Sequence, residues 1–112
     1  MPGKFELKVS TNGQFMFNLK ATNGQVILTS EQYKAKDDAV DGIASVRKHA
    51  AGDANFERKT SKNGEPFFSL KAANGRIIGK SETYSSATAM ENGIASVKAN
   101  APDAKLEDLT TQ

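Results

Sequence analysis

The feature of this sequence that most constrains its fold is an internal duplication. When the chain is shifted by 51 residues, residues 4–50 align with residues 55–101 without a gap, and 22 of the 47 aligned pairs are identical. A repeat of this length is one supersecondary unit written twice, so two similar units must pack against each other. The start of the unit recurs once more, because Asp103–Glu107 resembles Asp53–Glu57. We therefore divide a single domain, residues 1–112, into a first repeat (4–54), a second repeat (55–101) and a closing strand (103–109) that is a partial third copy.

Each repeat opens with alternating apolar and polar residues, the pattern of a half-buried strand. Residues 5–9 and 15–21 alternate in this way, and residues 26–29 form a third, continuously apolar stretch whose buried face the pattern leaves open. Asn-Gly pairs at 12–13 and 23–24 favour the positive φ that tight hairpin turns require. Each repeat is therefore predicted to begin as a three-stranded meander.

From about residue 36 the first repeat changes to a helical period, and the second repeat does so at the matching position. The apolar stripe consists of Ala39, Ile43, Val46 and Ala50 in the first helix and of Met90, Ile94, Val97 and Ala101 in the second. Ser85 or Ser86 can cap the second helix, whereas Lys34 and Ala35 at the matching positions cannot cap the first. Gly42 and Gly93 lie beside the stripe, which predicts a close approach of each helix to a strand or to the other helix.

One meander with one helix, about 50 residues, buries too little apolar surface to be stable alone. Two copies that share a sheet and place both helices on one face form an adequate core, and a closing strand from the other copy can cover an exposed sheet edge. We therefore predict an α+β fold made by tandem duplication of a β(3)-α-β unit. Its sheet is continuous and mostly antiparallel, with exchanged C-terminal strands and pseudo-twofold symmetry. The chain is expected to be a monomer with an internal pseudo-dimer.

The repeated motifs resemble those of the YegP-like family of small bacterial proteins. The motifs are Phe17-x-Leu-Lys-Ala with its Asn-Gly turn, Ser30-Glu-x-Tyr, and Gly42-Ile-x-Ser-Val, each of which recurs 51 residues later. The resemblance spans Lys4 to Leu109 and implies units that assemble one sheet and exchange their C-terminal strands. It brings no established activity. The sequence departs from the family at residues 34–35, where Ser-Ser is usual.

Composition excludes several classes of protein. The chain has 112 residues, of which 38% are hydrophobic and 25% charged, as in a soluble globular domain. The absence of Cys excludes disulfides, thiol catalysis and thiolate metal sites. No apolar run is long enough for a membrane span or a secretory segment, so we expect a cytoplasmic protein without a membrane partner. The net charge of +2 is too small to indicate a nucleic-acid binder by itself.

No group of residues points to catalysis, so we predict a non-enzymatic protein without catalytic residues, metal or cofactor. His49 is the single histidine, and we interpret it as a solvated, positively charged partner for a helix C-terminus rather than a general base. The Ser-Glu-x-Tyr segments at 30–33 and 81–84 lack a positioned base, and they are expected to satisfy backbone groups and cover the core edge. No Gly-rich phosphate loop is present. Three acidic residues on strands beside lysines predict cross-strand ion pairs rather than a cation site: Glu6, Glu57 and Glu107.

The sheet face away from the helices is the candidate working surface. If Phe17, Leu19 and their repeat partners face the helices, the residues between them point outward. The residues expected on this face are Lys8, Met16, Asn18, Lys20, Lys59, Phe67, Ser69 and Lys71. We expect a protein partner, bound by this face or by an edge strand. Single-stranded nucleic acid, held by stacking and phosphate contacts, is the alternative. Changing Lys20 and Lys71 together to Glu is expected to leave the fold intact, because both are expected to be exposed.

Overall fold

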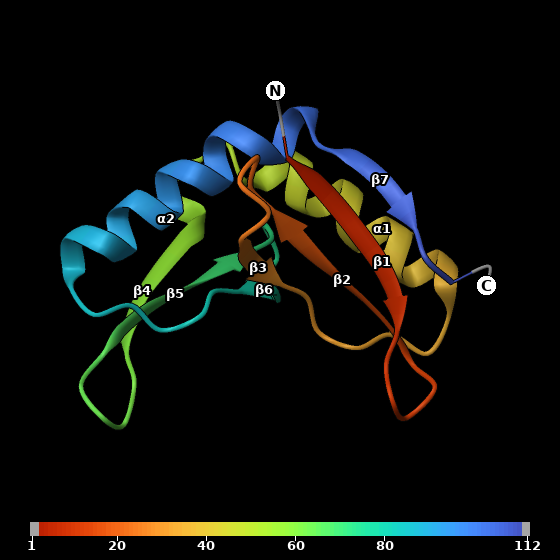
Figure 1. Cartoon of the computed structure of the whole chain (residues 1–112), viewed down its shortest axis with the longest axis horizontal. Coiled ribbons are helices and arrows are strands. Elements are labelled where there is room, and N and C mark those ends of the chain that lie inside the picture. The colour runs from red at the N-terminus through yellow and green to blue at the C-terminus, as the bar shows by residue number, and fades with distance from the viewer. Residues whose placement is uncertain (1–2, 111–112) are drawn as a thin grey trace.

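A computed structural model describes residues 3–110 as one seven-stranded sheet with two helices on one face (Figure 1). The first repeat forms β1 (Lys4–Val9), β2 (Phe15–Lys20), β3 (Val26–Thr29) and α1 (Lys36–His49). The second repeat forms β4 (Phe56–Thr60), β5 (Pro66–Lys71), β6 (Ile77–Lys80) and α2 (Ala87–Asn100). Short 3-10 turns at Asp53–Asn55 and Ala101–Asp103 follow the two helices, and the second leads into β7 (Lys105–Asp108).

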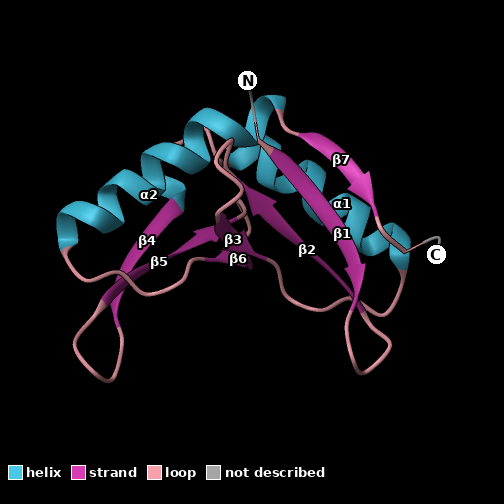
Figure 2. Cartoon of the chain, viewed as in Figure 1, coloured by secondary structure: helices cyan, strands magenta, loops and turns pink. Residues whose placement is uncertain are grey.

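The strand order is β4-β5-β6-β3-β2-β1-β7, and the strands meet antiparallel except for the parallel pair of β1 and β7 (Figure 2). The two repeats join at the centre of the sheet, where Thr29 of β3 lies opposite Lys80 of β6. After each helix the chain crosses to the far end of the sheet. β4 follows α1 and lies at the second repeat's edge, and β7 follows α2 and lies at the first repeat's edge. The predicted α+β duplication with an exchanged closing strand is confirmed.

The exchange covers one sheet edge and leaves its counterpart open. β7 pairs with β1 in register, with Lys105 opposite Lys4 and Leu106 opposite Phe5. Within residues 3–110, β4 pairs only with β5, and the place beside β4 that would match β7 holds no strand. The first repeat's side of the sheet therefore has four strands and the second repeat's side has three.

Local features follow the residue types at turns and caps. The glycines of the four Asn-Gly turns have φ between 83° and 86°, the left-handed conformation that glycine adopts without steric cost. Ser86 caps α2 by accepting a hydrogen bond from the Ala89 amide at 3.1 Å, whereas Ala35 gives α1 no side-chain cap. The predicted difference between the two helix starts is confirmed.

The core fills the space between the sheet and the helices. Its fully buried members include Phe5, Phe17 and Phe68, and the predicted helix stripes lie in the same cluster. On β3, neighbouring residues are buried on both sides of the strand. A register shift at the β2–β3 pairing accompanies burial of both Ile27 and Leu28.

Both helix glycines mark close contacts, but the contacts are with aromatic side chains. A Cβ on Gly42 would lie 2.6 Å from the Tyr33 hydroxyl and 3.0 Å from the Phe17 ring, and Gly93 meets Tyr84 in the same way. The nearest atoms are therefore those of aromatic side chains rather than the backbone of a strand or of the other helix. Each tyrosine covers the edge of the core, as the Ser-Glu-x-Tyr segments predict.

A further glycine lies where the two repeats meet. Leu28 of β3 is fully buried, and its counterpart in the second repeat is Gly79 of β6. A Cβ on Gly79 would lie 2.6 Å from Leu28 Cδ2. Near the axis that relates the repeats, a side chain meets its own counterpart, so the junction has room for one leucine only.

Candidate binding face

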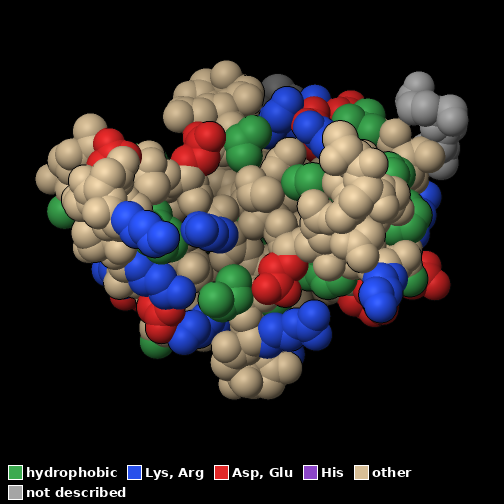
Figure 3. Space-filling view, turned by 90° about the horizontal axis from the view of Figure 1, so that it is seen from below, with side chains coloured by type: hydrophobic (Ala, Val, Ile, Leu, Met, Phe, Trp, Pro, Cys, Tyr) green, Lys and Arg blue, Asp and Glu red, His purple; other side chains and the backbone are tan. Residues whose placement is uncertain are grey.

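The sheet face opposite the helices carries all eight candidate residues, and we call it the open face. Met16, Asn18 and Lys20 alternate with core residues along β2, and Lys8 lies opposite Met16 on β1. The second repeat repeats this arrangement, with Lys59 opposite Phe67. Figure 3 views the molecule from this side, and basic side chains lie there in separate groups with acidic and hydrophobic side chains between them.

Glu6 is the centre of the charge cluster on the first repeat. Glu6 is only 6% exposed, and its carboxylate lies 3.0 Å from Lys20 Nζ and 3.5 Å from Lys8 Nζ. Lys4 Nζ lies 3.6 Å from the same carboxylate and 3.1 Å from Glu107. Burial opposes ionisation of Glu6, but the hydrogen bonds and charges of Lys20 and Lys8 outweigh it and hold the pKa of the carboxyl below its usual value.

Glu57 is the matching centre on the second repeat. Its carboxylate lies 2.6 Å from Lys71 Nζ and 2.9 Å from Lys59 Nζ. The hydrogen bonds from Lys71 and then Lys59 lower the pKa of this carboxyl. The predicted cross-strand ion pairs of Glu6 and Glu57 are confirmed, and Glu107 pairs with Lys4.

These pairs correct one expectation about the open face. Lys20 and Lys71 are half-buried and each is bonded to a glutamate, so neither is a freely exposed lysine. Changing both to Glu would bring carboxylates together at two places in the sheet, which is destabilising. Exchange to Gln is the appropriate neutral substitution.

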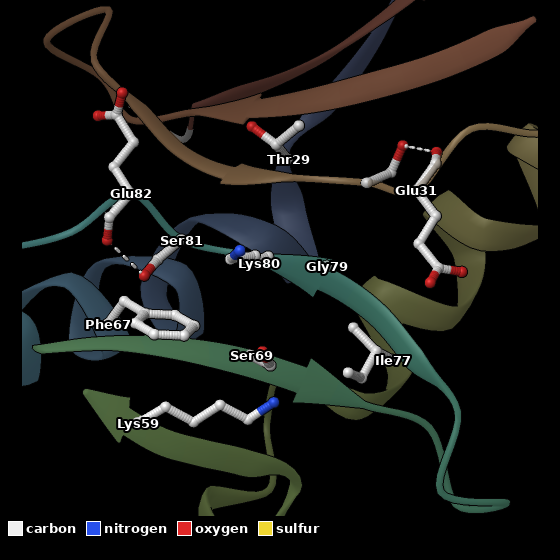
Figure 4. Close-up of a pocket in the computed structure, with 11 residues that line it drawn as sticks. Thr29, Glu31, Lys59, Phe67, Ser69, Ile77, Gly79, Lys80, Ser81 and Glu82 are labelled. Atoms are coloured by element: carbon white, nitrogen blue, oxygen red, sulfur yellow. Dashed lines mark hydrogen bonds between the residues drawn. The ribbon is translucent and has the colours of Figure 1, made fainter. Parts of the chain in front are cut away.

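A hollow of about 390 Å³ lies where β3 meets β6, next to Lys59 of the Glu57 cluster (Figure 4). It is lined by side chains from both repeats, namely Thr29, Ser30, Glu31, Lys59, Phe67, Ser69, Ile77, Lys80, Ser81 and Glu82, together with Gly79. Lys80 Nζ lies 5.0 Å from the centre of the Phe67 ring, a cation–π distance. Ser69 is only 1% exposed beside this hollow.

The hollow brings together three of the candidate residues, Lys59, Phe67 and Ser69, and leaves the other five outside. Sequence reasoning did not assign Lys80 or Ile77 to the face. Both lie on β6, whose short continuous apolar run gives no clear alternation. The pairing of Leu28 with Gly79 in the aligned repeats is the one sequence signal for this junction.

The Ser-Glu-x-Tyr segments serve the backbone, as predicted. The Ser30 hydroxyl accepts from the Phe17 amide at 2.9 Å and donates to the Glu31 carbonyl at 2.7 Å. Ser81 makes the same two bonds with Phe68 and Glu82. Both hydroxyls are therefore occupied in fixing the start of each strand-to-helix connection.

His49 differs from its prediction. The Ala73 amide, which can only donate, lies 3.1 Å from His49 Nε2, so this nitrogen is the acceptor. Nδ1 then carries the proton and donates to the Ser45 carbonyl at 2.9 Å. The ring is neutral and half-buried rather than a solvated cation, and it joins α1 to the β5–β6 turn of the other repeat.

Residues 3–110 contain neither a metal-binding cluster of side chains nor a membrane-spanning helix. No group of three or more His, Cys, Asp or Glu side chains within this range is arranged to hold a metal ion. No helix within the same range is long and apolar enough to cross a membrane.

The fold and the open face define a small α+β protein built from two tandem repeats. The chain belongs to the DUF1508 family, described as a domain of unknown function, whose profile matches residues 10–57 and 61–108. It is 56% identical over 110 residues to a UPF0339 protein of Bordetella pertussis, with 98% of each chain covered. It is 49% identical over 108 residues to the UPF0339 protein YegP of Yersinia pestis, with 96% of each covered.

Two solved structures share the architecture. The solution NMR structure of yegP from E. coli, a protein of unknown function, is 50% identical with a TM-score of 0.94, and the match covers 100% of this chain and 97% of that one. A UPF0339 protein of Shewanella oneidensis is 48% identical with a TM-score of 0.94 and coverage of 100% and 95%. The resemblance to YegP-like proteins is confirmed, and these relatives carry no named enzymatic activity.

Proposed function

We propose that this chain is a non-enzymatic binding protein and that its open face holds a segment of a partner protein in the central hollow. The observation that supports a protein partner is the pairing of charges. All four candidate lysines, Lys8, Lys20, Lys59 and Lys71, lie within 3.5 Å of Glu6 or Glu57. Binding to a nucleic-acid backbone gains its free energy from cations that neutralise phosphates, and cations already paired with carboxylates contribute less.

The lining of the hollow suits a polypeptide. Phe67 and Ile77 offer apolar contact to a side chain of the partner. Lys80 and Glu82 supply both signs of charge at the rim, as expected for a surface that meets mixed side chains. A hollow of about 390 Å³ lies at the lower end of the range for ligand pockets, so it fits one or two side chains of a partner.

Selection from a displayed library of random peptides on the immobilised full chain tests this proposal. The selected peptides are synthesised and titrated into ¹⁵N-labelled protein. Phe67→Ala is expected to weaken binding, whereas Met16→Ala, at the matching position of the first repeat, is expected to leave it unchanged. Peptides that shift the amides of β5 and β6 support the proposal. Selection that yields no saturable binder, or binders insensitive to Phe67→Ala, overturns it.

A labelled single-stranded oligonucleotide is the second probe. The proposal expects no binding that depends on the open face. Fluorescence anisotropy that rises with protein, falls with salt and is lost in the Lys59→Gln/Lys80→Gln variant would replace the protein partner with nucleic acid.

A further inference from the structure

The open edge of β4 is a second candidate surface, independent of the hollow. The N–H of Leu109 donates to the carbonyl of Leu7 at 2.9 Å, so the backbone groups of Leu7 face β7. Arg58 is the counterpart of Leu7 in the second repeat. Because backbone groups alternate in direction along a strand, those of Arg58 and Thr60 and the carbonyl of Phe56 face outward, where residues 3–110 supply no strand. The Phe56 N–H donates to the Asp53 carbonyl of the preceding turn.

The contacts of β7 with the first repeat show which kind of strand can dock on such an edge. The strand runs parallel to β1, with Leu106 opposite Phe5 and Asp108 opposite Leu7. Arg47 of α1 donates from Nη2 to the Ala104 carbonyl at 2.7 Å and lies 5.3 Å above the Phe5 ring. Lys36 Nζ lies 2.5 Å from the Asp108 carboxylate. A leucine, an acidic side chain and two cations on the protein define this docking.

The second repeat also has two cations at its own edge, although Ala87 stands at the position that matches Lys36. Lys98 is the counterpart of Arg47 and lies 5.7 Å above the ring of Phe56, the counterpart of Phe5. Arg58 lies at the position that faces Asp108 in the first repeat. The β4 edge thus has one cation placed for a carbonyl and one placed for a carboxylate.

Both cations are held by carboxylates of the same chain. Arg58 makes two bonds to Glu91, from Nε at 2.5 Å and from Nη2 at 2.9 Å. Asp53 lies 3.3 Å from Arg58 Nη2 and 2.6 Å from Lys98 Nζ. All four side chains are at least one-third exposed, so an incoming carboxylate can reach and exchange with these partners.

We propose that the β4 edge binds an extended, acidic segment of another polypeptide as an added parallel strand. The segment carries leucine opposite Phe56 and a carboxylate opposite Arg58, and Glu91 and Asp53 act as internal competitors for the two cations. Main-chain hydrogen bonds supply the affinity, and the leucine and the carboxylate supply the specificity. This surface lies at the end of the sheet. If no strand binds there, the proposal for the hollow is unaffected.

A peptide with the sequence of residues 103–109, Asp-Ala-Lys-Leu-Glu-Asp-Leu, tests the proposal on the full chain. Titration into ¹⁵N-labelled protein is expected to shift the amides of Phe56, Arg58 and Thr60 and to leave those of Phe5 and Leu7 in place. Glu91→Ala removes the internal competitor of Arg58 and is expected to tighten binding about two- to fivefold, the worth of one exposed ion pair. A peptide with Lys in place of its second Asp is expected to bind at least about tenfold more weakly.

Two further variants test the role of Arg58 and provide a control. Arg58→Gln removes the charge with little change in shape and is expected to abolish the discrimination between the two peptides. Lys62→Glu alters charge on the exposed β4–β5 turn and is expected to change nothing. The proposal is overturned by shifts confined to β1 and β7, by no saturable shift at millimolar peptide, or by binding that appears only in Glu91→Ala. Self-association of the wild-type chain through β4 would show that the edge binds a second copy of this chain. That result would also overturn the proposal of a separate protein partner.

Discussion

The contact between Leu28 and Gly79 predicts strong energetic coupling between two equivalent positions of the duplication. Leu28 is fully buried, so Leu28→Ala is expected to cost about 3–5 kcal/mol, the upper range for a leucine whose site cannot collapse. Gly79→Ala would place a Cβ 2.6 Å from Leu28 Cδ2 and 2.7 Å from Cγ. Such overpacking costs about 1–3 kcal/mol. Replacing a strand glycine returns up to about 1 kcal/mol, so a net loss of about 1–2 kcal/mol is expected.

The double variant separates this explanation from two independent losses. With Leu28 shortened, the new methyl group of Gly79→Ala enters the vacated space, and its effect changes to neutral or stabilising. The coupling free energy is therefore expected to be about 1–3 kcal/mol. The full exchange, Leu28→Gly with Gly79→Leu, moves the same side chain to the other repeat and is expected to recover most of the stability lost by Leu28→Gly alone.

Urea unfolding of the four proteins of the cycle measures these values, provided that the transitions are two-state. Leu7→Ala is the control, because Leu7 is also fully buried but lies on β1, three strands from β6 in the sheet. Its loss is expected to add to that of Gly79→Ala within about 0.5 kcal/mol. Additive losses for Leu28→Ala and Gly79→Ala would refute the reasoning that one leucine fills the junction.

Three other substitutions have defined outcomes. Gly93→Ala, whose Cβ would lie 2.7 Å from Tyr84 Cζ, is expected to lower the urea midpoint despite a helix-propensity gain of about 1 kcal/mol, and to raise it in a Tyr84→Ala background. Ala35→Ser supplies the missing cap of α1 and is expected to raise the free energy of unfolding by about 0.5–1 kcal/mol in the same assay; no gain would show that the start of α1 is held by other contacts. The hydrogen bond from Lys36 lowers the pKa of Asp108 from 3.8 to about 2, so its stabilisation is complete above about pH 4 and is lost as the pH falls toward 2. Asp108→Asn is expected to lower the thermal midpoint at pH 6 and to match the wild type near pH 2, and a constant difference across this range would contradict the assignment.

The fold was predictable because its strongest signals are local or repeated. The shift of 51 residues exposes the duplication, the Asn-Gly pairs mark the hairpins, and the missing serine at Ala35 marks the uncapped helix. The candidate face followed from the period of two along β2 and β5. The cross-strand ion pairs were also predicted, but the exposure of Lys20 and the environment of His49 were not. The environment of Lys20 depends on Glu6 two strand positions away, and the charge of His49 depends on an amide of the other repeat, Ala73.

The positions where the two repeats differ are as informative as those where they agree. A strand that follows a helix in this chain also begins the next repeat, so α1 is followed by β4, and the last helix alone supplies an extra strand, β7. Two linked repeats therefore provide one closing strand for two equivalent edges. The sequence departs from its own symmetry at two places where identical residues would be unfavourable, the junction of the repeats and the uncovered edge. Leu28 faces Gly79 where the repeats meet, and Leu7, covered by β7, becomes Arg58 on the uncovered edge. A leucine at position 58 would leave an apolar, unpaired edge open to aggregation, whereas a charged residue keeps that edge soluble and accessible.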